Sequence, residues 1–180
     1  MTSVLGGTLT ALDRSGTPFM LAGSVASGFY STPRTTNDVD VVIDPSVEQF
    51  DRFLGLMAHQ DWYLDPVAAR RALAARDMFA AIDTSTGWKI DLIIRKDRPF
   101  SKMEFSRRIP VSFLGVPAYI ASREDMILSK LEWALIGGSE RQLLDVSAII
   151  EVAAELDDDY LDEWADRLGV SELLAKLRSR

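Results

Sequence analysis

The sequence contains no cysteine, which excludes a disulfide framework and a thiolate metal site. It also lacks any apolar run long enough to cross a membrane. The first residues, Met1-Thr2-Ser3, do not form a basic segment leading into an apolar core, so we expect no signal peptide and a cytoplasmic protein. The 180 residues are 47% hydrophobic, which is enough for one compact domain or one domain with a small appendage.

Positive charge is in deficit overall, and the formal net charge of −7 argues against a general nucleic-acid coat protein. Most of the excess acid lies in residues 151–180, which hold nine acids and four bases. Residues 66–110 reverse this balance, with ten Lys or Arg against five acids. We interpret this basic segment as a candidate phosphate-facing surface.

The most informative stretch runs from Leu21 to Ile43 and predicts a strand, a turn, a short helix and a second strand. On the second strand side chains alternate between the two faces, so Asp38 and Asp40 share one face. Two carboxylates in one small volume repel each other, and both stay ionised only if a cation lies between them. Mg²⁺ is the natural candidate because it prefers oxygen ligands and typically takes one or two protein carboxylates.

Gly23 and Ser24 lie between the first strand and the helix, where they supply the features of a phosphate-binding turn. Glycine lets the backbone approach a phosphate closely, and Ser24 is placed to cap the helix whose first N–H groups point at the anion. Taken alone, Gly-Ser is most often an ordinary turn, and Asp-x-Asp is common on surface strands. Their occurrence together, in this order, favours a functional site.

With Arg34-x-Thr36-x-Asp38-x-Asp40 following Gly23-Ser24, the stretch resembles the nucleotidyltransferase superfamily, which includes DNA polymerase beta and the aminoglycoside nucleotidyltransferases. The resemblance implies transfer of a nucleoside monophosphate from an NTP to a hydroxyl. It also implies two Mg²⁺ ions held by three carboxylates, the third of them on a later strand.

A suitable third carboxylate is Asp91. Residues 78–83 and 88–94 predict a hairpin, and Asp91 interrupts the apolar residues of its second strand. An acid in such a strand needs a partner. The resemblance implies that Asp91 binds metal and accepts the proton of the attacking hydroxyl. The alternative is a salt bridge at the edge of the core, to Lys89 or Arg95.

The remaining patterns of residues 1–120 predict an α/β domain with a small mixed β-sheet flanked by helices. Helical spacing is found in residues 4–12, in the segment after Ser46, and in residues 67–75. In the second of these, Phe50, Phe53, Leu54 and Met57 fall on one face. Residues 109–113 and 116–120 predict a final hairpin that closes the sheet.

From Ser122 onward the patterns are helical, so we expect an all-helical C-terminal subdomain over residues 121–180. Lys130 falls inside an apolar helix face, where its amine must either reach solvent or meet an anion such as a nucleotide phosphate. The spacing of Lys130, Arg141 and Asp145 resembles the AbiEii-type nucleotidyltransferases, which are toxins of toxin–antitoxin systems. Leu144 and Ala148 depart from that pattern, which has Lys and Asp at these positions.

The combined expectation is a nucleotidyltransferase fold with a magnesium-dependent site between the two parts. The acceptor is RNA such as tRNA, or protein, with an antitoxin as possible partner. A small-molecule acceptor and a non-catalytic binding module are the alternatives. The predicted residues are Asp38, Asp40 and Asp91 for catalysis and metal binding, and Gly23, Ser24, Arg34, Thr36 and Lys130 for nucleotide binding.

Overall fold

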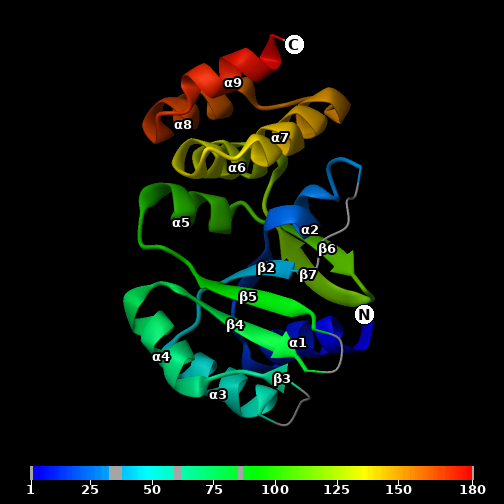
Figure 1. Cartoon of the computed structure of the whole chain (residues 1–180), viewed down its shortest axis with the longest axis vertical. Helices are drawn as coiled ribbons and strands as arrows, with labels where there is room; N and C mark the ends of the chain where they lie inside the picture. Colours follow the sequence, from blue (N-terminus) through cyan, green and yellow to red (C-terminus); the bar gives the residue numbers. More distant parts are fainter. Residues whose placement is uncertain (1, 33–37, 59–61, 85–86, 180) are drawn as a thin grey trace.

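A mixed β-sheet forms the centre of this computed structural model, which describes residues 2–32, 38–58, 62–84 and 87–179. Within those residues seven strands lie in the order β3-β4-β5-β2-β1-β7-β6 (Figure 1). Both predicted hairpins, β4/β5 and β6/β7, are confirmed. The strands are β1 (Phe19–Leu21), β2 (Asp38–Ile43), β3 (Trp62–Tyr63), β4 (Met78–Asp83), β5 (Lys89–Ile94), β6 (Ile109–Phe113) and β7 (Val116–Ile120).

Strand β2 lies in the middle of the sheet, parallel to β5 and antiparallel to β1. Val39, Val41 and Ile43 point to a buried face and have almost no exposed surface. The alternate residues Asp40 and Val42 point to the opposite face and are only partly covered. The period of two along β2 therefore separates a core side from a polar side, as the sequence predicted.

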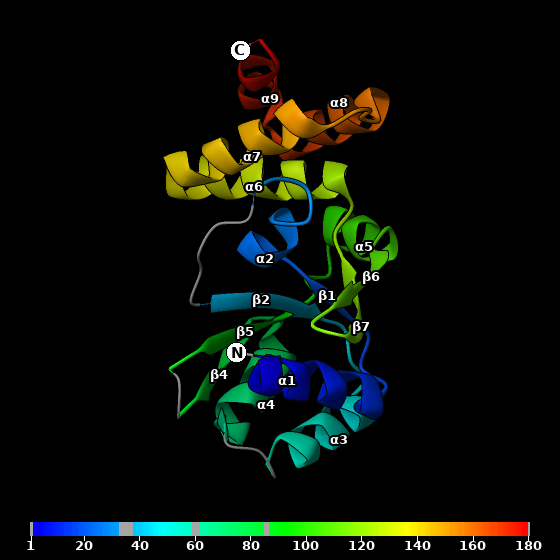
Figure 2. The same ribbon diagram turned by 90° about the vertical axis from the view of Figure 1, so that its right-hand side faces the viewer.

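Helices cover both faces of the sheet. On the core side lie α1 (Thr2–Ser15), α3 (Val47–Met57) and α4 (Pro66–Ala75), whereas α2 (Gly23–Ser27) and α5 (Pro99–Ser106) lie on the other side (Figures 1 and 2). Helix α3 begins at a complete capping box formed by Ser46 and Gln49. Its predicted apolar face is buried, which confirms the pattern.

Helix α5 was not predicted from the sequence. It begins with Pro99 at its first position, where the missing N–H costs nothing, and it buries Phe100, Ser101 and Phe105. The charged residues on both sides of this short segment conceal its apolar spacing. Helix α5 lies between the sheet and the C-terminal helices (Figures 1 and 2), and it forms part of the cavity wall beside the candidate site.

The C-terminal part is a stack of helices that begins directly beyond α2 and α5 (Figure 2). It consists of α6 (Arg123–Gly137), α7 (Glu140–Val152), α8 (Asp158–Leu168) and α9 (Ser171–Arg178). In the described part of the chain, no helix combines the length and apolar character needed to span a membrane. Strand β7 ends at Ile120, close to the predicted domain division between residues 120 and 121, which stays a prediction.

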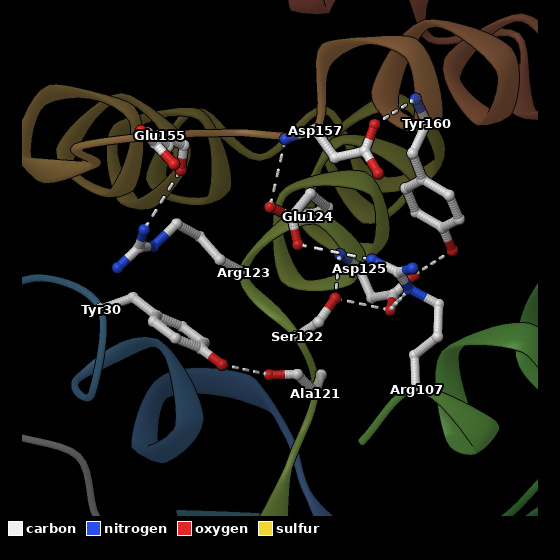
Figure 3. A network of polar contacts seen from close by, with 10 residues as sticks. All are labelled: Tyr30, Arg107, Ala121, Ser122, Arg123, Glu124, Asp125, Glu155, Asp157 and Tyr160. Carbon is white, nitrogen blue, oxygen red and sulfur yellow. Dashed lines mark hydrogen bonds and ion pairs between the residues drawn. The ribbon is translucent and has the colours of Figure 1, made fainter. Parts of the chain in front are cut away.

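A buried carboxylate ties the start of this stack to the rest of the molecule (Figure 3). Asp125 has no exposed surface. It accepts hydrogen bonds from Ser122 Oγ at 2.6 Å, Tyr160 Oη at 2.5 Å and Arg107 Nε at 3.2 Å. The partners come from the start of α6, from α8 and from the end of α5. One acid therefore joins three elements, and its charge is compensated by a guanidinium.

The connection between β7 and α6 is held on its other side by Tyr30, which follows α2. Its hydroxyl donates to the backbone oxygen of Ala121 at 2.7 Å, and the guanidinium of Arg123 lies 5.3 Å from its ring centre (Figure 3). Burial raises the pKa of Tyr30 to about 12, so this hydroxyl remains a donor at neutral pH. The orientation of α6 relative to the sheet is therefore fixed from two directions.

Replacement of Tyr160 by Phe tests the contribution of this network. We expect the free energy of unfolding to fall by about 1.5 kcal/mol, because Asp125 stays buried but loses one of its donors. Urea unfolding of wild type and Tyr160→Phe measures the difference. Tyr63→Phe is the control, since that ring is 62% exposed. Equal effects of the two substitutions would contradict a structural role for the Tyr160 hydroxyl.

Candidate functional site

The pairing of β2 with β5 brings two of the three predicted acids together. The register places Asp40 directly opposite Asp91 and Asp38 opposite Lys89. Residues directly opposite each other on neighbouring strands point to the same face, so the two carboxylates lie side by side on the polar face of the sheet. Asp91 is only 6% exposed, whereas Asp38 lies at the exposed start of β2.

The electrostatics of this cluster favour a cation. Burial raises the pKa of Asp40, and the negative charges of Asp38 and Asp91 raise it further, against the lowering effect of Lys130 and Lys89. The Oδ1 atom of Asp91 is buried and has no hydrogen-bond partner among the described residues. A positive ion beside these oxygens would stabilise the ionised form of Asp40 and would give Asp91 Oδ1 a partner.

Asp91 also forms the predicted alternative contact, because its Oδ2 lies 2.7 Å from Lys89 Nζ. Arg95, the other suggested partner, binds Asp44 at 2.8 Å instead. Within the described ranges, no three acidic, histidine or cysteine side chains converge in a metal-binding arrangement. The donor chemistry nevertheless fits Mg²⁺, which typically takes one or two carboxylates and completes its shell with water and phosphate oxygens. The carboxylate of Asp40 and the unpaired Oδ1 of Asp91 are the groups that would hold the Mg²⁺ ion.

Gly23 is in direct contact with Asp40. Its φ is +57°, and a Cβ built on it would lie 1.8 Å from Asp40 Oδ2 and 2.8 Å from Asp40 Cγ. The neighbouring Ala22 N–H donates to the backbone oxygen of Asp40 at 2.9 Å. Only glycine satisfies both the left-handed backbone and the close approach. The turn predicted from Gly23-Ser24 is therefore packed against the carboxylate predicted from Asp-x-Asp.

The prediction that Ser24 caps this helix is wrong. Helix α2 begins at Gly23, its cap position is Ala22, and Ala22 makes no side-chain cap hydrogen bond. Ser24 lies one position inside the first turn, because the left-handed glycine starts the helix earlier than the Gly-Ser pattern suggested. A role of Gly23 and Ser24 in nucleotide binding stays a prediction. Arg34 and Thr36 lie outside the described residues.

Lys130 enters the site from α6 and is only 3% exposed. Its Nζ donates to Asp145 Oδ2 at 2.7 Å and to Gln142 Oε1 at 3.0 Å, both on α7. Of the two alternatives, the amine therefore meets an anion rather than reaching solvent, and that anion belongs to the protein. Its lowering effect on the Asp40 pKa shows that Lys130 acts electrostatically on the carboxylate cluster.

A cavity of about 330 Å³ extends from Gly23 and Asp40 between the sheet, α5 and α6. The sequence patterns do not reveal most of this cavity wall, because they predict no helix at α5 and place only Lys130 of α6 in the site. The signal that could have found α5 is Pro99 followed by Phe100 and Phe105. The lining residues beyond Gly23, Asp40 and Lys130 are Ala22, Val42, Met78, Ile93, Ile94, Arg95, Lys96, Arg98, Ser101, Glu104, Met126, Ser129, Glu132, Trp133, Ile136 and Gln142.

The basic segment is largely neutralised by acids of the same chain. Arg98, for example, binds Glu132 through both guanidinium NH₂ nitrogens, each at 2.5 Å. Seven of the ten bases at positions 66–110, all of them within the described residues, form ion pairs, and little unpaired charge is left for a phosphate backbone. They are Arg70, Arg76, Lys89, Arg95, Arg98, Lys102 and Arg107.

Glu104 on α5 is a cavity residue with an altered acidity. Burial raises its pKa from 4.5 to about 8, and the charges of Asp125 and Glu132 add to this against the opposing effect of Arg98. Between pH 4.5 and about pH 8, Glu104 keeps its proton in the folded chain and loses it in the unfolded chain. The free energy of unfolding therefore falls as pH rises, by at most about 1.4 kcal/mol per pH unit.

Glu104→Gln removes this pH dependence. We expect the substitution to change stability little at pH 5 and to raise the free energy of unfolding at pH 8, as measured by urea unfolding at both values. Glu48→Gln is a control of opposite sign, because a hydrogen bond from Ser46 lowers the pKa of Glu48. A gain for Glu104→Gln that is equal at pH 5 and pH 8 would contradict a raised pKa.

Comparison with known proteins gives structural neighbours only, since no protein-family model and no curated protein sequence matches the chain. An antigenic nucleotidyltransferase-like protein from Paracoccidioides brasiliensis is 17% identical, with 99% of this chain and 92% of that chain covered and a TM-score of 0.62. ANT(2")-Ia in complex with adenylyl-2"-tobramycin is 14% identical, with 99% and 97% covered and a TM-score of 0.58.

A third neighbour is the lincosamide antibiotic adenylyltransferase LnuA in its lincomycin-bound form. It is 9% identical, with 83% of this chain and 96% of that chain covered and a TM-score of 0.52. The first two likenesses cover 99% of this chain, so they include the sheet and the C-terminal helices together. The chain therefore has the nucleotidyltransferase fold, which confirms the predicted fold class.

Proposed function

We propose that this protein is a metal-dependent nucleotidyltransferase that moves a nucleoside monophosphate from an NTP to a hydroxyl acceptor. The observation that carries the proposal is the arrangement of Gly23, Asp40 and Asp91. Gly23 contacts the Asp40 carboxylate, which lies opposite Asp91 on the adjacent parallel strand. This arrangement raises the pKa of Asp40 and so opposes folding at neutral pH. A protein that only binds a partner has no need for such a cluster.

The transfer forms a bond between the acceptor oxygen and the α-phosphorus and breaks the bond from that phosphorus to pyrophosphate. Two Mg²⁺ ions held by Asp38, Asp40 and Asp91 would supply charge neutralisation for the phosphates. The buried carboxylate of Asp91 would also accept the proton of the attacking hydroxyl. Gly23 and Ser24 would lie against the phosphates, and Lys130 would offset the negative charge that develops on them.

The structural neighbours bear on the acceptor only through the compounds named with them. ANT(2")-Ia holds an adenylylated antibiotic and LnuA is named for a lincosamide antibiotic, so both support a small-molecule acceptor. The cavity beside Asp40 has the size of a small-molecule site. Transfer to tRNA or protein, a toxin of the AbiEii type and an antitoxin partner stay predictions.

Transfer of label from each α-³²P NTP tests the proposal. Purified protein with Mg²⁺ is offered total tRNA, a protein mixture, itself and a panel of small hydroxyl compounds, with Asp38→Ala in parallel. We expect label in one acceptor class and none with the variant. No label in any pool, together with no Mg²⁺-dependent NTP binding, would instead indicate the non-catalytic binding module.

A further inference from the structure

The wall of the cavity next to the carboxylates is mostly apolar. Val42 on β2 and Ile93 on β5 lie side by side, and each follows the acid of its strand, Asp40 or Asp91, by two residues. Met78 pairs with Ile93 from β4 and is 49% exposed. Across the cavity α6 contributes Trp133, which is 54% exposed. A molecule that enters here gains by covering these apolar surfaces.

The acids of this cavity are unavailable to a cationic ligand. The charge of Glu132 is matched by both nitrogens of Arg98, and the raised pKa keeps Glu104 protonated at neutral pH. Asp40, the third acid of the lining, belongs to the cluster that would hold metal. A polycation would therefore lose its hydration without finding carboxylate partners in return.

One cation of the lining has no acid partner within the part of the chain that the structure describes. Lys96 follows β5, and its amine lies 5.7 Å from the ring centre of Trp133. The other basic groups of the cavity are engaged, since Arg95 binds Asp44, Arg98 binds Glu132 and Lys130 binds Asp145. Lys96 thus gives the apolar end of the cavity an uncompensated positive charge.

We infer that the acceptor is a small hydroxyl compound with an apolar body and an acidic group, which Lys96 and Trp133 hold in the cavity, and that polycations are excluded. The inference rests on the proposed function, because it names the acceptor of the same transfer. It assigns Lys96 and Trp133 as specificity-determining residues. The chemistry differs from that of tobramycin, a polyamine, which ANT(2")-Ia holds in adenylylated form.

Binding of matched probes tests this inference without requiring turnover. The probes are 4-(2-hydroxyethyl)benzoate, its uncharged counterpart 2-phenylethanol, and tobramycin, each titrated by ligand-observed NMR in the presence of Mg²⁺ and a non-hydrolysable α,β-methylene ATP. We expect the benzoate to bind about 5-fold more tightly than the neutral alcohol, because its carboxylate forms one solvent-exposed charge pair with Lys96. Tobramycin is expected not to bind in the cavity.

Two lysine variants assign the charge preference. Lys96→Gln is expected to reduce the ratio of the two affinities to about one. Lys102→Gln is the matched control, because Lys102 is an exposed lysine of the same region that pairs with Asp97 and does not line the cavity. It is expected to keep the wild-type ratio.

Trp133→Ala is expected to weaken the binding of both aromatic probes by the same factor, which a surface charge effect alone would not do.

Several results would overturn the inference. Tighter binding of tobramycin than of the benzoate would show that the cavity selects cations. An affinity ratio unchanged in Lys96→Gln would remove Lys96 from recognition. Benzoate binding that occurs only when the ATP analogue is left out of the titration would assign the cavity to the nucleotide. These failures leave the proposed function intact when the analogue itself binds with Mg²⁺. Absence of analogue binding overturns the proposed function, and this inference with it.

Discussion

Asp40→Asn is expected to lower kcat/KM for nucleotide transfer by roughly 10³-fold or more, because it removes a charged metal ligand and leaves a similar shape. Asp40 is the acid in contact with Gly23 and opposite Asp91, so both halves of the proposed site meet at this side chain. Initial rates of label transfer, with wild type measured in parallel, give the ratio. Lys130→Gln should cost far less activity, because it removes a charge beside the site and no metal ligand.

Stability measurements separate loss of chemistry from loss of fold in the Asp40→Asn variant. The folded chain raises the pKa of Asp40, so its ionised form opposes folding at every pH above the ordinary carboxyl pKa. A neutral Asn removes this penalty, and we expect the free energy of unfolding at pH 8 to be equal or higher. Asp97→Asn, an exposed acid near the cavity, is the activity control. Full activity of Asp40→Asn would exclude the proposed metal site.

Gly23→Ala is expected to damage both stability and activity. The new Cβ would overlap the Asp40 carboxyl group, and the backbone of residue 23 would have to keep a φ of +57° that alanine disfavours. We expect the free energy of unfolding to fall by about 2 kcal/mol. Asp40 must also move, and a displacement of about 1 Å at a reacting centre costs on the order of 100-fold in rate. Urea unfolding and initial rates measure the two effects.

The control for this substitution is Gly55→Ala. Gly55 lies inside helix α3, and a Cβ at this position meets nothing within 4 Å. Alanine is the better helix former, so we expect a gain of up to about 1 kcal/mol and unchanged transfer. If Gly23→Ala and Gly55→Ala behaved alike, the contact between Gly23 and Asp40 would have no role in the site.

The sequence was sufficient for features that depend on local patterns. The alternation along Asp38–Ile43 predicted both the strand and the shared face of its acids, and the apolar face that begins at Phe50 predicted α3. The α/β class and the helical C-terminal part also followed from such patterns, whereas the nucleotidyltransferase fold was expected from the family resemblance. The role of Asp91 required the resemblance as well, because one acid in an apolar strand is equally consistent with the salt bridge to Lys89.

Features that depend on contacts distant in the sequence were not predictable in this way. The partner of Lys130 is Asp145, which lies on the next helix, and no helical spacing within α6 reveals it. The cavity wall formed by Glu104 and Trp133 likewise requires the packing of α5 against α6. The basic count of residues 66–110 suggested free positive charge, but acids as far away as Asp51 and Glu132 neutralise much of it.

The register between β2 and β5 also determines where the chain tolerates changes in length. Asp40 and Asp91 are neighbours because two strands pair residue by residue, and a strand that slips by one residue turns every side chain to the opposite face. An insertion within either strand would carry its acid into the hydrophobic core. Segments outside the paired residues lengthen at little energetic cost. We therefore expect this chain to tolerate added residues between β2 and β5, and to lose the pairing of the two acids when a residue is added within either strand.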